Sequence, residues 1–363
     1  MNKKNLVYYC SLVIAVLIAI FAIFFSNTFK SLSNHIFIFL TNRFGWLYLL
    51  AMLFFVVFSL FVAVSKFGKI RLGENDSKPE YSNISWFAML FCAGMGVGLV
   101  FWGISEPLSH YLNPISSVTP SSKDSIDFAF KSVFMHWGIH PWAAYAVIGL
   151  PMAYFQFRKK KNGLISSTME PLVGKKLTEG WFGKIVDIFA AFATLAGIVT
   201  SLGLGVLQIN SGLESTLDLP NNTISQIAII VVVTIIFVLS AVSGIDKGVK
   251  KLSNITLILI VVFMAICFTI GPKQEILNNF VNGLGYYLND FFKDSLEIST
   301  YTDASWTLSW RVFYWAWWIA WAPFVGMFIA RISKGRTIRE FIFGVVLVPS
   351  MASFVWFSIF GSM

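Results

Sequence analysis

Long apolar runs, separated by short polar segments, dominate the chain. Nine runs have about twenty residues or more, the length that an α-helix needs to cross about 30 Å of hydrocarbon. They cover residues 6–25, 46–64, 84–104, 128–157, 185–206, 224–245, 252–270, 309–330 and 341–360. The first run is too long for a signal peptide, and no small-residue cleavage site precedes Asn27. The pattern predicts an all-α, polytopic membrane helix bundle with about nine transmembrane helices.

Two segments between the runs carry a weaker, amphipathic pattern. Residues 272–308 are too polar to cross a membrane, yet they contain apolar residues at helical spacing. These residues are Ile276, Leu277, Phe280, Val281, Leu284 and Leu288. The spacing predicts a helix that lies along the outer surface of the bundle. The pattern of residues 164–177 predicts a similar amphipathic helix on the inner side.

The composition supports a membrane protein and indicates its orientation. Hydrophobic residues make up 56% of the chain and charged residues 12%, whereas soluble domains have about 25% charged residues. The net charge of +9 does not indicate nucleic-acid binding, because the basic residues stand in short segments between apolar runs. Most of the 27 Lys and Arg residues fall on one side when the N-terminus is placed in the cytoplasm. The positive-inside rule therefore predicts a multi-pass cell-membrane protein with a cytoplasmic N-terminus and the C-terminal end outside.

The third run contains three closely spaced glycines, in the sequence AGMGVGLVFWGISEP. Gly94, Gly96 and Gly98 each destabilise a helix by about 1 kcal/mol, so a break is expected here that frees backbone amides and carbonyls. In secondary transporters such breaks bind a carboxylate and sodium. Gly94 and Gly98 also form a GxxxG pattern, which is typical of close helix packing, and the pattern alone does not choose between the two.

The eighth run is rich in tryptophan. It contains Trp310, Trp315, Trp317, Trp318 and Trp321. Indole faces attract cations by about 2 kcal/mol or more when water is excluded, so this surface favours a quaternary ammonium group, which has no N–H to satisfy. Trp310 and Trp315 also fit an interfacial aromatic belt. Trp318 and Trp321 do not, since Pro323 follows them in mid-run, where it is expected to break the helix.

The fourth run contains MHWGIHPWAAY, which places Trp137, Trp142 and Tyr145 near its middle. This is the wrong depth for an aromatic belt. His136 and His140 have the four-residue spacing of zinc ligands, but no third His, Cys or carboxylate accompanies them. We interpret both histidines as polar groups that link helices.

The fifth run, FATLAGIVTSLGLGVLQ, supplies the hydroxyls of Thr194, Thr200 and Ser201. Each hydroxyl either bonds back to its own helix or completes an ion site. Back-bonding is the expected state of each one singly.

Together these motifs resemble the betaine/carnitine/choline transporter family. The resemblance rests on GMGVGLVFWGISEP, HWGIHPWAAY, TSLGLGVLQIN and, most specifically, FYWAWWIAWAPFVGMFIARISKGRTIREF. It covers the chain from the second or third run to the end. It implies an inverted-repeat fold of the sodium-symporter type, a homotrimer in the lipid bilayer and a trimethylammonium substrate. The implied organisation is two N-terminal helices in 1–83, a first five-helix repeat in 84–271, an extracellular helix and connector in 272–308, and the start of a second repeat in 309–363.

The resemblance also implies the binding residues. An aromatic box around the ammonium would consist of Trp137, Trp142, Tyr145 and Trp318, with Trp317 and Trp321 lining the path. The stretch with Gly94, Gly96 and Gly98 would meet the substrate carboxylate. Sodium, as the coupling ion, would bind the carbonyls of Cys92 and Met95 and a second site at Thr194 and Phe324. Ile198 stands where a family hydroxyl would help to coordinate that second ion.

Two further features bear on function. Members of the family have about three more spans, so the chain is expected to be truncated within its second repeat and not to transport alone. Relatives that carry choline often have an acidic residue at the position of Gly98, so the neutral glycine favours glycine betaine.

The predicted function is sodium-coupled import of glycine betaine for osmoprotection. Choline or carnitine transport is the alternative within the family. A non-transporting fragment, channel or receptor-like protein that binds a quaternary ammonium ligand is an alternative of another class. An enzyme is not expected, because the runs contain no paired acids and no nucleophile beside a base; no cofactor other than the coupling ion and no nucleic-acid partner are expected.

Overall fold

The computed structural model describes residues 3–244, 248–298 and 303–363, with side chains described except at residues 3–5, 94 and 95. Its helices are α1 (Lys3–Phe24), α2 (Ser26–Val64), α3 (Asn83–Leu112), α4 (Lys123–Trp137), α5 (Ile139–Ala153), α6 (Ile165–Thr168), α7 (Glu170–Val173), α8 (Lys175–Glu179), α9 (Trp181–Leu217), α10 (Thr223–Val242), α11 (Lys250–Ile270), α12 (Lys273–Asn289), α13 (Phe291–Leu296), α14 (Ser305–Thr307), α15 (Phe313–Ile332) and α16 (Ile338–Gly361). In this part of the chain, extended pairing is confined to one bridge between Arg71 and Thr337. The all-α prediction is confirmed.

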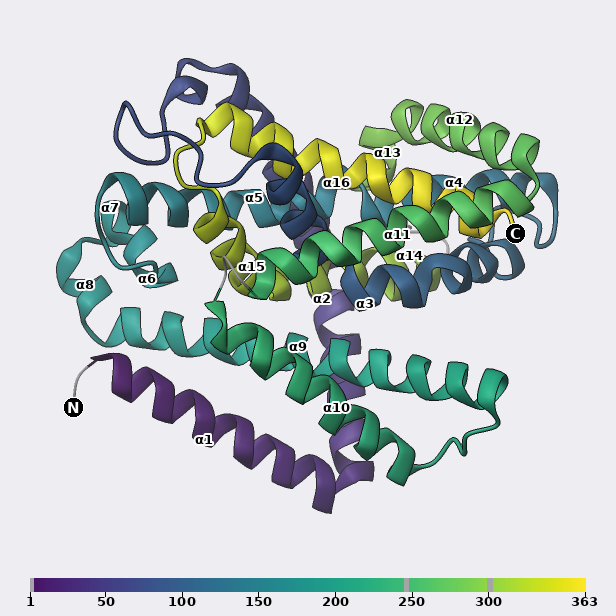
Figure 1. The fold of residues 1–363 in the computed structure, drawn as a ribbon, viewed down its shortest axis with the longest axis horizontal. Coiled ribbons are helices and arrows are strands. Elements are labelled where there is room, and N and C mark those ends of the chain that lie inside the picture. Colours follow the sequence, from purple (N-terminus) through teal and green to yellow (C-terminus); the bar gives the residue numbers. More distant parts are fainter. Residues whose placement is uncertain (1–2, 245–247, 299–302) are drawn as a thin grey trace.

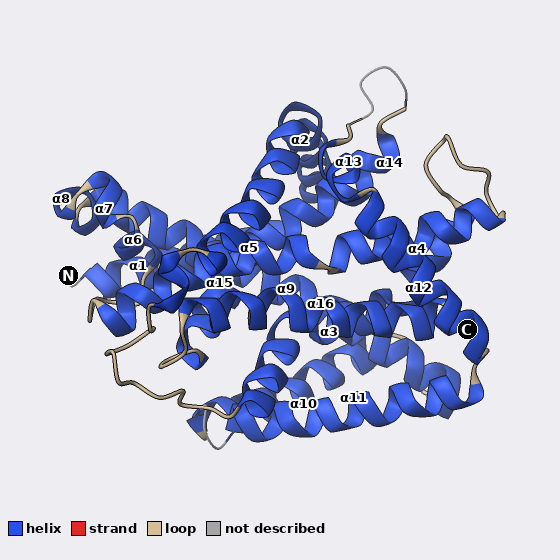
Figure 2. Cartoon of the chain, turned by 90° about the horizontal axis from the view of Figure 1, so that it is seen from above, coloured by secondary structure: helices blue, strands red, loops and turns tan. Residues whose placement is uncertain are grey.

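The helices form a bundle whose two ends are distinct. In Figures 1 and 2 the N-terminus and the short helices α6–α8 lie at one end, and the C-terminus and α12 lie at the other. α15 packs along α5, and α16 packs on α3 and α5. α1 and α10 pack on α9, below this core in Figure 1. The best-buried aromatic side chains therefore lie where α3, α4, α5, α15 and α16 meet.

Seven helices among the described residues are long and apolar enough to cross a membrane, and the bent α3 makes an eighth. The fourth predicted span, residues 128–157, is divided at Gly138 into α4 and α5, which have 15 residues each. A Cβ at Gly138 would lie 2.3 Å from the Phe134 carbonyl oxygen, so only glycine fits this turn. Pro141 in the first turn of α5 has no N–H for the last carbonyls of α4.

Two predicted segments differ from the structure. α2 is one helix of 39 residues and includes residues 26–45, which the prediction left outside the span. The helix continues because its first half contains no proline, and Phe37 there packs on Phe313 of α15 with ring centroids 5.8 Å apart. The single inner helix predicted for 164–177 is wrong, since α6, α7 and α8 are separate and Gly174 between the last two has φ +83°.

The amphipathic helix predicted within 272–308 is present as α12, which packs on α4 and α16; its position on the outer side of the membrane stays a prediction. The following α13 is tied to α4 by an ion pair between Lys131 Nζ and Asp294 Oδ2 at 3.1 Å. Lys131 also donates to Asp290 Oδ2 at 2.7 Å, and this hydrogen bond lowers the pKa of the Asp290 carboxyl. Lys131 thus fixes α13 and the end of α12 to the helix that carries Trp137.

α5 and α15 approach each other closely at two glycines. A Cβ added to Gly149 would lie 3.0 Å from the carbonyl oxygen of Gly326, and one added to Gly326 would lie 3.0 Å from the Gly149 nitrogen. The missing side chains let the two backbones touch, which brings the aromatic residues of both helices together.

We therefore expect Gly149→Val to lower the free energy of unfolding by about 1 to 3 kcal/mol, because the new methyl groups must push backbone aside. Denaturant unfolding in detergent, followed by intrinsic fluorescence, measures the change. Gly203→Val is the matched control, since a Cβ at Gly203 meets nothing within 4 Å. Equal stability of the two variants would contradict this packing.

Candidate functional site

Four aromatic rings from three helices meet in the core of the bundle: Trp137 of α4, Trp142 and Tyr145 of α5, and Trp318 of α15. Trp318 lies at the centre, with ring centroids 5.1 Å from Trp137 and 5.8 Å from Tyr145. Trp142 and Tyr145 are 5.6 Å apart at right angles. Each of the four side chains is at most 3% exposed. We call this group the aromatic cage.

Local structure explains how the cage assembles. The turn at Gly138 ends α4 directly after Trp137 and starts α5, while Trp142 and Tyr145 stand three residues apart and so share a face of α5. On α15, Trp317 stacks on Trp318 with centroids 5.2 Å apart and an interplanar angle of 9°. The residues named from the sequence for the ammonium box are therefore linked by ring contacts, from Trp137 through Trp318 and Tyr145 to Trp142.

The predicted break in the third span is confirmed. Gly96 has non-helical backbone angles of φ −53° and ψ −110°, and the two parts of α3 meet at 65°. A Cβ at Gly98 would lie 3.2 Å from Cη2 of Trp137 and 3.5 Å from Cη2 of Trp317. The broken helix thus passes directly beside the cage. The side chain of Met95 and the surroundings of Gly94 lie outside the described residues.

The predicted break near Trp321 and Pro323 is wrong. α15 runs through Pro323 as one helix, and the irregular backbone lies earlier, in the π-helical turn Leu308–Val312. Contacts with neighbouring helices hold both sides of the proline. Before it, the Trp321 indole faces Gly197 of α9, where a Cβ would come within 2.8 Å of the ring. After it, Gly326 of α15 packs against Gly149 of α5. Such packing lets membrane helices accept proline. Trp321 pairs with Phe324 at 5.4 Å and stands one turn away from the cage.

The residues named for sodium occupy two places. The Cys92 thiol donates to the Ser253 carbonyl of α11 at 3.6 Å. The hydroxyls of Thr194 and Thr200 bond back to their own helix, to the carbonyls of Ala190 and Ala196, as expected for single hydroxyls. Thr194 also lines a largely apolar cavity of about 370 Å³ between α1, α9 and α15. The sodium assignment of Cys92, Met95, Thr194 and Phe324 remains a prediction.

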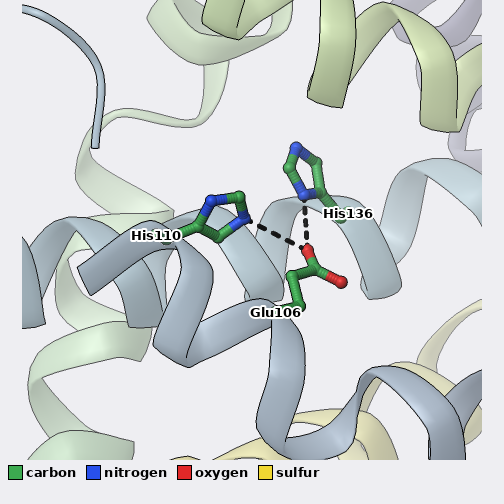
Figure 3. Close-up of side chains that lie close together, drawn as sticks. All are labelled: Glu106, His110 and His136. Atoms are coloured by element: carbon green, nitrogen blue, oxygen red, sulfur yellow. Dashed lines mark hydrogen bonds and ion pairs between the residues drawn. The ribbon is translucent and has the colours of Figure 1, made fainter. Parts of the chain in front are cut away.

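Sequence reasoning missed a buried polar cluster beside the cage (Figure 3), centred on Glu106 of α3. His136 Nδ1 lies 2.7 Å and His110 Nε2 lies 3.3 Å from Glu106 Oε1. All three side chains are fully buried. The interpretation that no carboxylate or further histidine accompanies His136 is therefore wrong, because Glu106 and His110 lie beside it in the folded chain. The available signal was an acidic residue two positions beyond the run at 84–104, in a helix that continues to Leu112; acidic residues in membrane helices point to function.

His136 and His140, the pair with zinc-ligand spacing, have different hydrogen-bond partners. His140 hydrogen-bonds to the Ser295 hydroxyl at 2.9 Å and stacks on Trp315 with centroids 5.2 Å apart. The ligand atoms of Glu106, His110 and His136 lie within 4.8 Å of one another, close enough for a metal ion. Both oxygens of Glu106 already accept hydrogen bonds from protein donors, so the arrangement favours a hydrogen-bond network.

Six buried indole N–H groups lack an acceptor among the described residues, including that of Trp317, which stacks on Trp318 of the cage; the others are those of Trp102, Trp306, Trp315, Trp321 and Trp356. A buried donor without an acceptor costs about 1 to 3 kcal/mol. An anionic or carbonyl group of a ligand would satisfy such donors. The site thus combines a desolvated aromatic surface with donors in need of an acceptor.

Known proteins resemble this chain along most of its length. The model of a family described as "BCCT, betaine/carnitine/choline family transporter" matches residues 6–363. A "Probable glycine betaine transporter" of Desulfitobacterium hafniense (strain Y51) is 46% identical over 360 residues, which are 99% of this chain and 72% of that protein. "Glycine betaine transporter OpuD" of Bacillus subtilis (strain 168) is 49% identical over 325 residues, 89% of this chain and 63% of that protein. An "Ectoine/hydroxyectoine transporter" of Virgibacillus pantothenticus is 44% identical over 365 residues, 99% of this chain and 72% of that protein.

Proposed function

Because this chain belongs to the betaine/carnitine/choline transporter family, we propose that it serves the uptake of glycine betaine and binds the substrate's trimethylammonium group in the aromatic cage. Glycine betaine is the substrate named for the relatives from Desulfitobacterium hafniense and Bacillus subtilis. The chain spans 72% and 63% of the lengths of these two relatives, so the activity of the whole protein is part of the proposal.

The observation that carries this proposal is the contact of Trp137, Tyr145 and Trp318 across three helices. Their burial removes water from the ring faces, and a desolvated cation over such a ring gains about 2 kcal/mol or more. A trimethylammonium group presents only methyl groups to the rings, so it needs no hydrogen-bond acceptor there. A primary ammonium would be left with unsatisfied N–H groups.

The other end of the substrate is a carboxylate, and the neighbouring groups suit it. Gly98 has no side chain, so a ligand can approach the broken backbone of α3. The indole N–H of Trp317, whose ring lies beside Gly98, is free to donate to a carboxylate oxygen. No acidic side chain stands at position 98 to repel it. These features favour a zwitterion over choline.

We infer sodium coupling from the charge of the proposed substrate. A zwitterion gains nothing from the membrane potential, whereas each co-transported sodium ion contributes about 2.3 kcal/mol per 100 mV. We assign the ion to the carbonyls of Cys92 and Met95 and, at a second position, to Thr194 and Phe324. Assembly as a homotrimer, a cytoplasmic N-terminus and a role in osmoprotection complete the proposal.

The test is equilibrium binding of labelled glycine betaine to the purified chain in lipid nanodiscs. We expect saturable binding that is tighter in NaCl than in KCl, and competition by unlabelled betaine that exceeds competition by choline or ectoine. Binding that is not saturable would contradict the substrate assignment. Equal affinity in both salts would contradict sodium coupling, and uptake into cells without dependence on a sodium gradient would favour a channel-like protein.

A further inference from the structure

We propose that Glu106 is the positioning residue of the aromatic cage: its buried carboxylate fixes Trp137 directly and Trp318 through His136. The expected effect on substrate binding rests on the proposed function, whereas the contacts of Glu106 are observed in the structure. Glu106 does not belong to the cage itself. It acts through the rings that it holds.

The direct link is to Trp137. The Trp137 indole Nε1–H donates to Glu106 Oε2 at 2.7 Å, and the Tyr314 hydroxyl donates to the same oxygen. These bonds join α3 to α4 and α15 across 31 and 208 positions of the chain. Rotation about its side-chain χ angles would give an indole ring more than one available orientation. A short hydrogen bond to a buried carboxylate selects one of these orientations.

The indirect link is to Trp318, at the centre of the cage. The Trp318 indole Nε1–H donates to the backbone carbonyl of His136 at 3.0 Å, and the His136 ring is held by Glu106 Oε1 at 2.7 Å. The His136 ring also stacks on Tyr314, with centroids 4.6 Å apart and an interplanar angle of 8°. The carboxylate thus fixes the backbone turn on which Trp318 depends.

The chemistry of the cluster requires a carboxylate. An ionised carboxylate has about four acceptor positions and no donor. Glu106 faces four donors, two at each oxygen: His136 and His110 at Oε1, Trp137 and Tyr314 at Oε2. Glutamine has almost the same shape, but its NH₂ group would face two donors at one end. With the NH₂ group at Oε2, the Trp137 and Tyr314 donors must move away from it. With the NH₂ group at Oε1, His136 and His110 must change tautomer to accept from it, which replaces their two charge-assisted bonds by weaker neutral ones.

We expect Glu106→Gln to raise the Kd for glycine betaine about tenfold, as for the loss of one charged hydrogen bond. It is also expected to shift the ¹⁵N-indole NMR resonances of Trp137 and Trp318, while that of Trp142 stays in place. The chain contains 13 tryptophans, so selective ¹⁵N-tryptophan labelling in nanodiscs and single Trp→Phe variants give the assignments. Ser105→Ala is the control, because the Ser105 hydroxyl bonds only to the Phe101 carbonyl of its own helix.

The outcomes separate this inference from the proposed function. A wild-type chain without betaine binding overturns the proposed function, whereas unchanged Trp137 and Trp318 resonances in Glu106→Gln overturn the positioning role with or without ligand. A general loss of stability would lower the number of binding sites and leave their Kd unchanged, which also contradicts the inference.

If Glu106→Gln does not fold, His110→Phe keeps the ring packing on Phe128 and Trp306 and removes the longest of the four bonds. It is expected to shift the same two resonances and to raise the Kd by about twofold or more.

Discussion

Replacing Trp318 by alanine is expected to weaken glycine betaine binding about thirtyfold, because one desolvated cation–π partner is worth about 2 kcal/mol. Trp318 is the ring with the largest expected effect, since it contacts both Trp137 and Tyr145. Its loss also removes the donor to the His136 carbonyl. Phenylalanine at position 318 retains an aromatic face and is expected to retain much of the affinity.

Equilibrium binding of labelled betaine to the variants in nanodiscs measures these effects, with the number of sites per chain reporting the folded fraction. Trp181→Ala is the matched control: the Trp181 side chain at the start of α9 is 71% exposed, and the Lys184 ammonium lies over its ring. We expect its Kd to equal that of the wild type. If Trp318→Ala binds with unchanged Kd and full site number, the substrate lies elsewhere.

The parts of this fold that could be predicted from sequence are those set by local pattern. An apolar run of about twenty residues has few alternatives to a helix in a bilayer, because every backbone group must be satisfied internally. α10 and α11 accordingly lie within a few residues of the runs at 224–245 and 252–270. The break at Gly96 was also predictable, because glycine weakens a helix wherever it stands.

Features that depend on neighbouring helices were not predictable in this way. Pro323 was expected to end regular helix, but packing on α5 and α9 keeps α15 continuous. Conversely, Gly138 and Pro141 together divide a run whose hydropathy indicated one span. Contacts between helices can outweigh a local helix propensity of a few kcal/mol. Such contacts cannot be read from spacing along the sequence.

The polar cluster shows the same limit for the site. The hydrogen bond from Tyr314 to Glu106 joins residues 208 positions apart, and no spacing rule connects them. The cage residues were found because aromatic residues at mid-membrane depth are unusual in themselves. Glu106 was also unusual, as an acidic residue next to an apolar run, yet its partners could be named only from the structure. The motifs contain Glu106, His136 and Tyr314, but they do not reveal that these side chains meet.

Replacing Gly98 by aspartate is expected to weaken betaine binding by at least about thirtyfold. A Cβ at this position already comes within 3.2 Å of Trp137 and 3.5 Å of Trp317, so the new carboxylate would stand at the edge of the site. Two carboxylates about 8 Å apart repel each other by about 2 kcal/mol at an effective dielectric constant of about 20, which is a factor of about thirty in affinity. The steric contact with the two indoles adds to this repulsion.

The same carboxylate is expected to admit choline with less dependence on sodium. It attracts the cationic substrate and partly replaces both the substrate carboxylate and the charge of the coupling ion. Gly98→Asn separates charge from size, because asparagine has the shape of aspartate without its charge: it should weaken betaine binding through contact with Trp137 and Trp317, and it should not gain choline. Competition between labelled betaine and choline, with and without sodium, provides the measurement for all three proteins. If wild type already prefers choline, or if Gly98→Asp keeps its betaine selectivity and full sodium dependence, then Gly98 does not face the substrate carboxylate, and the orientation of the zwitterion in the cage must be reversed.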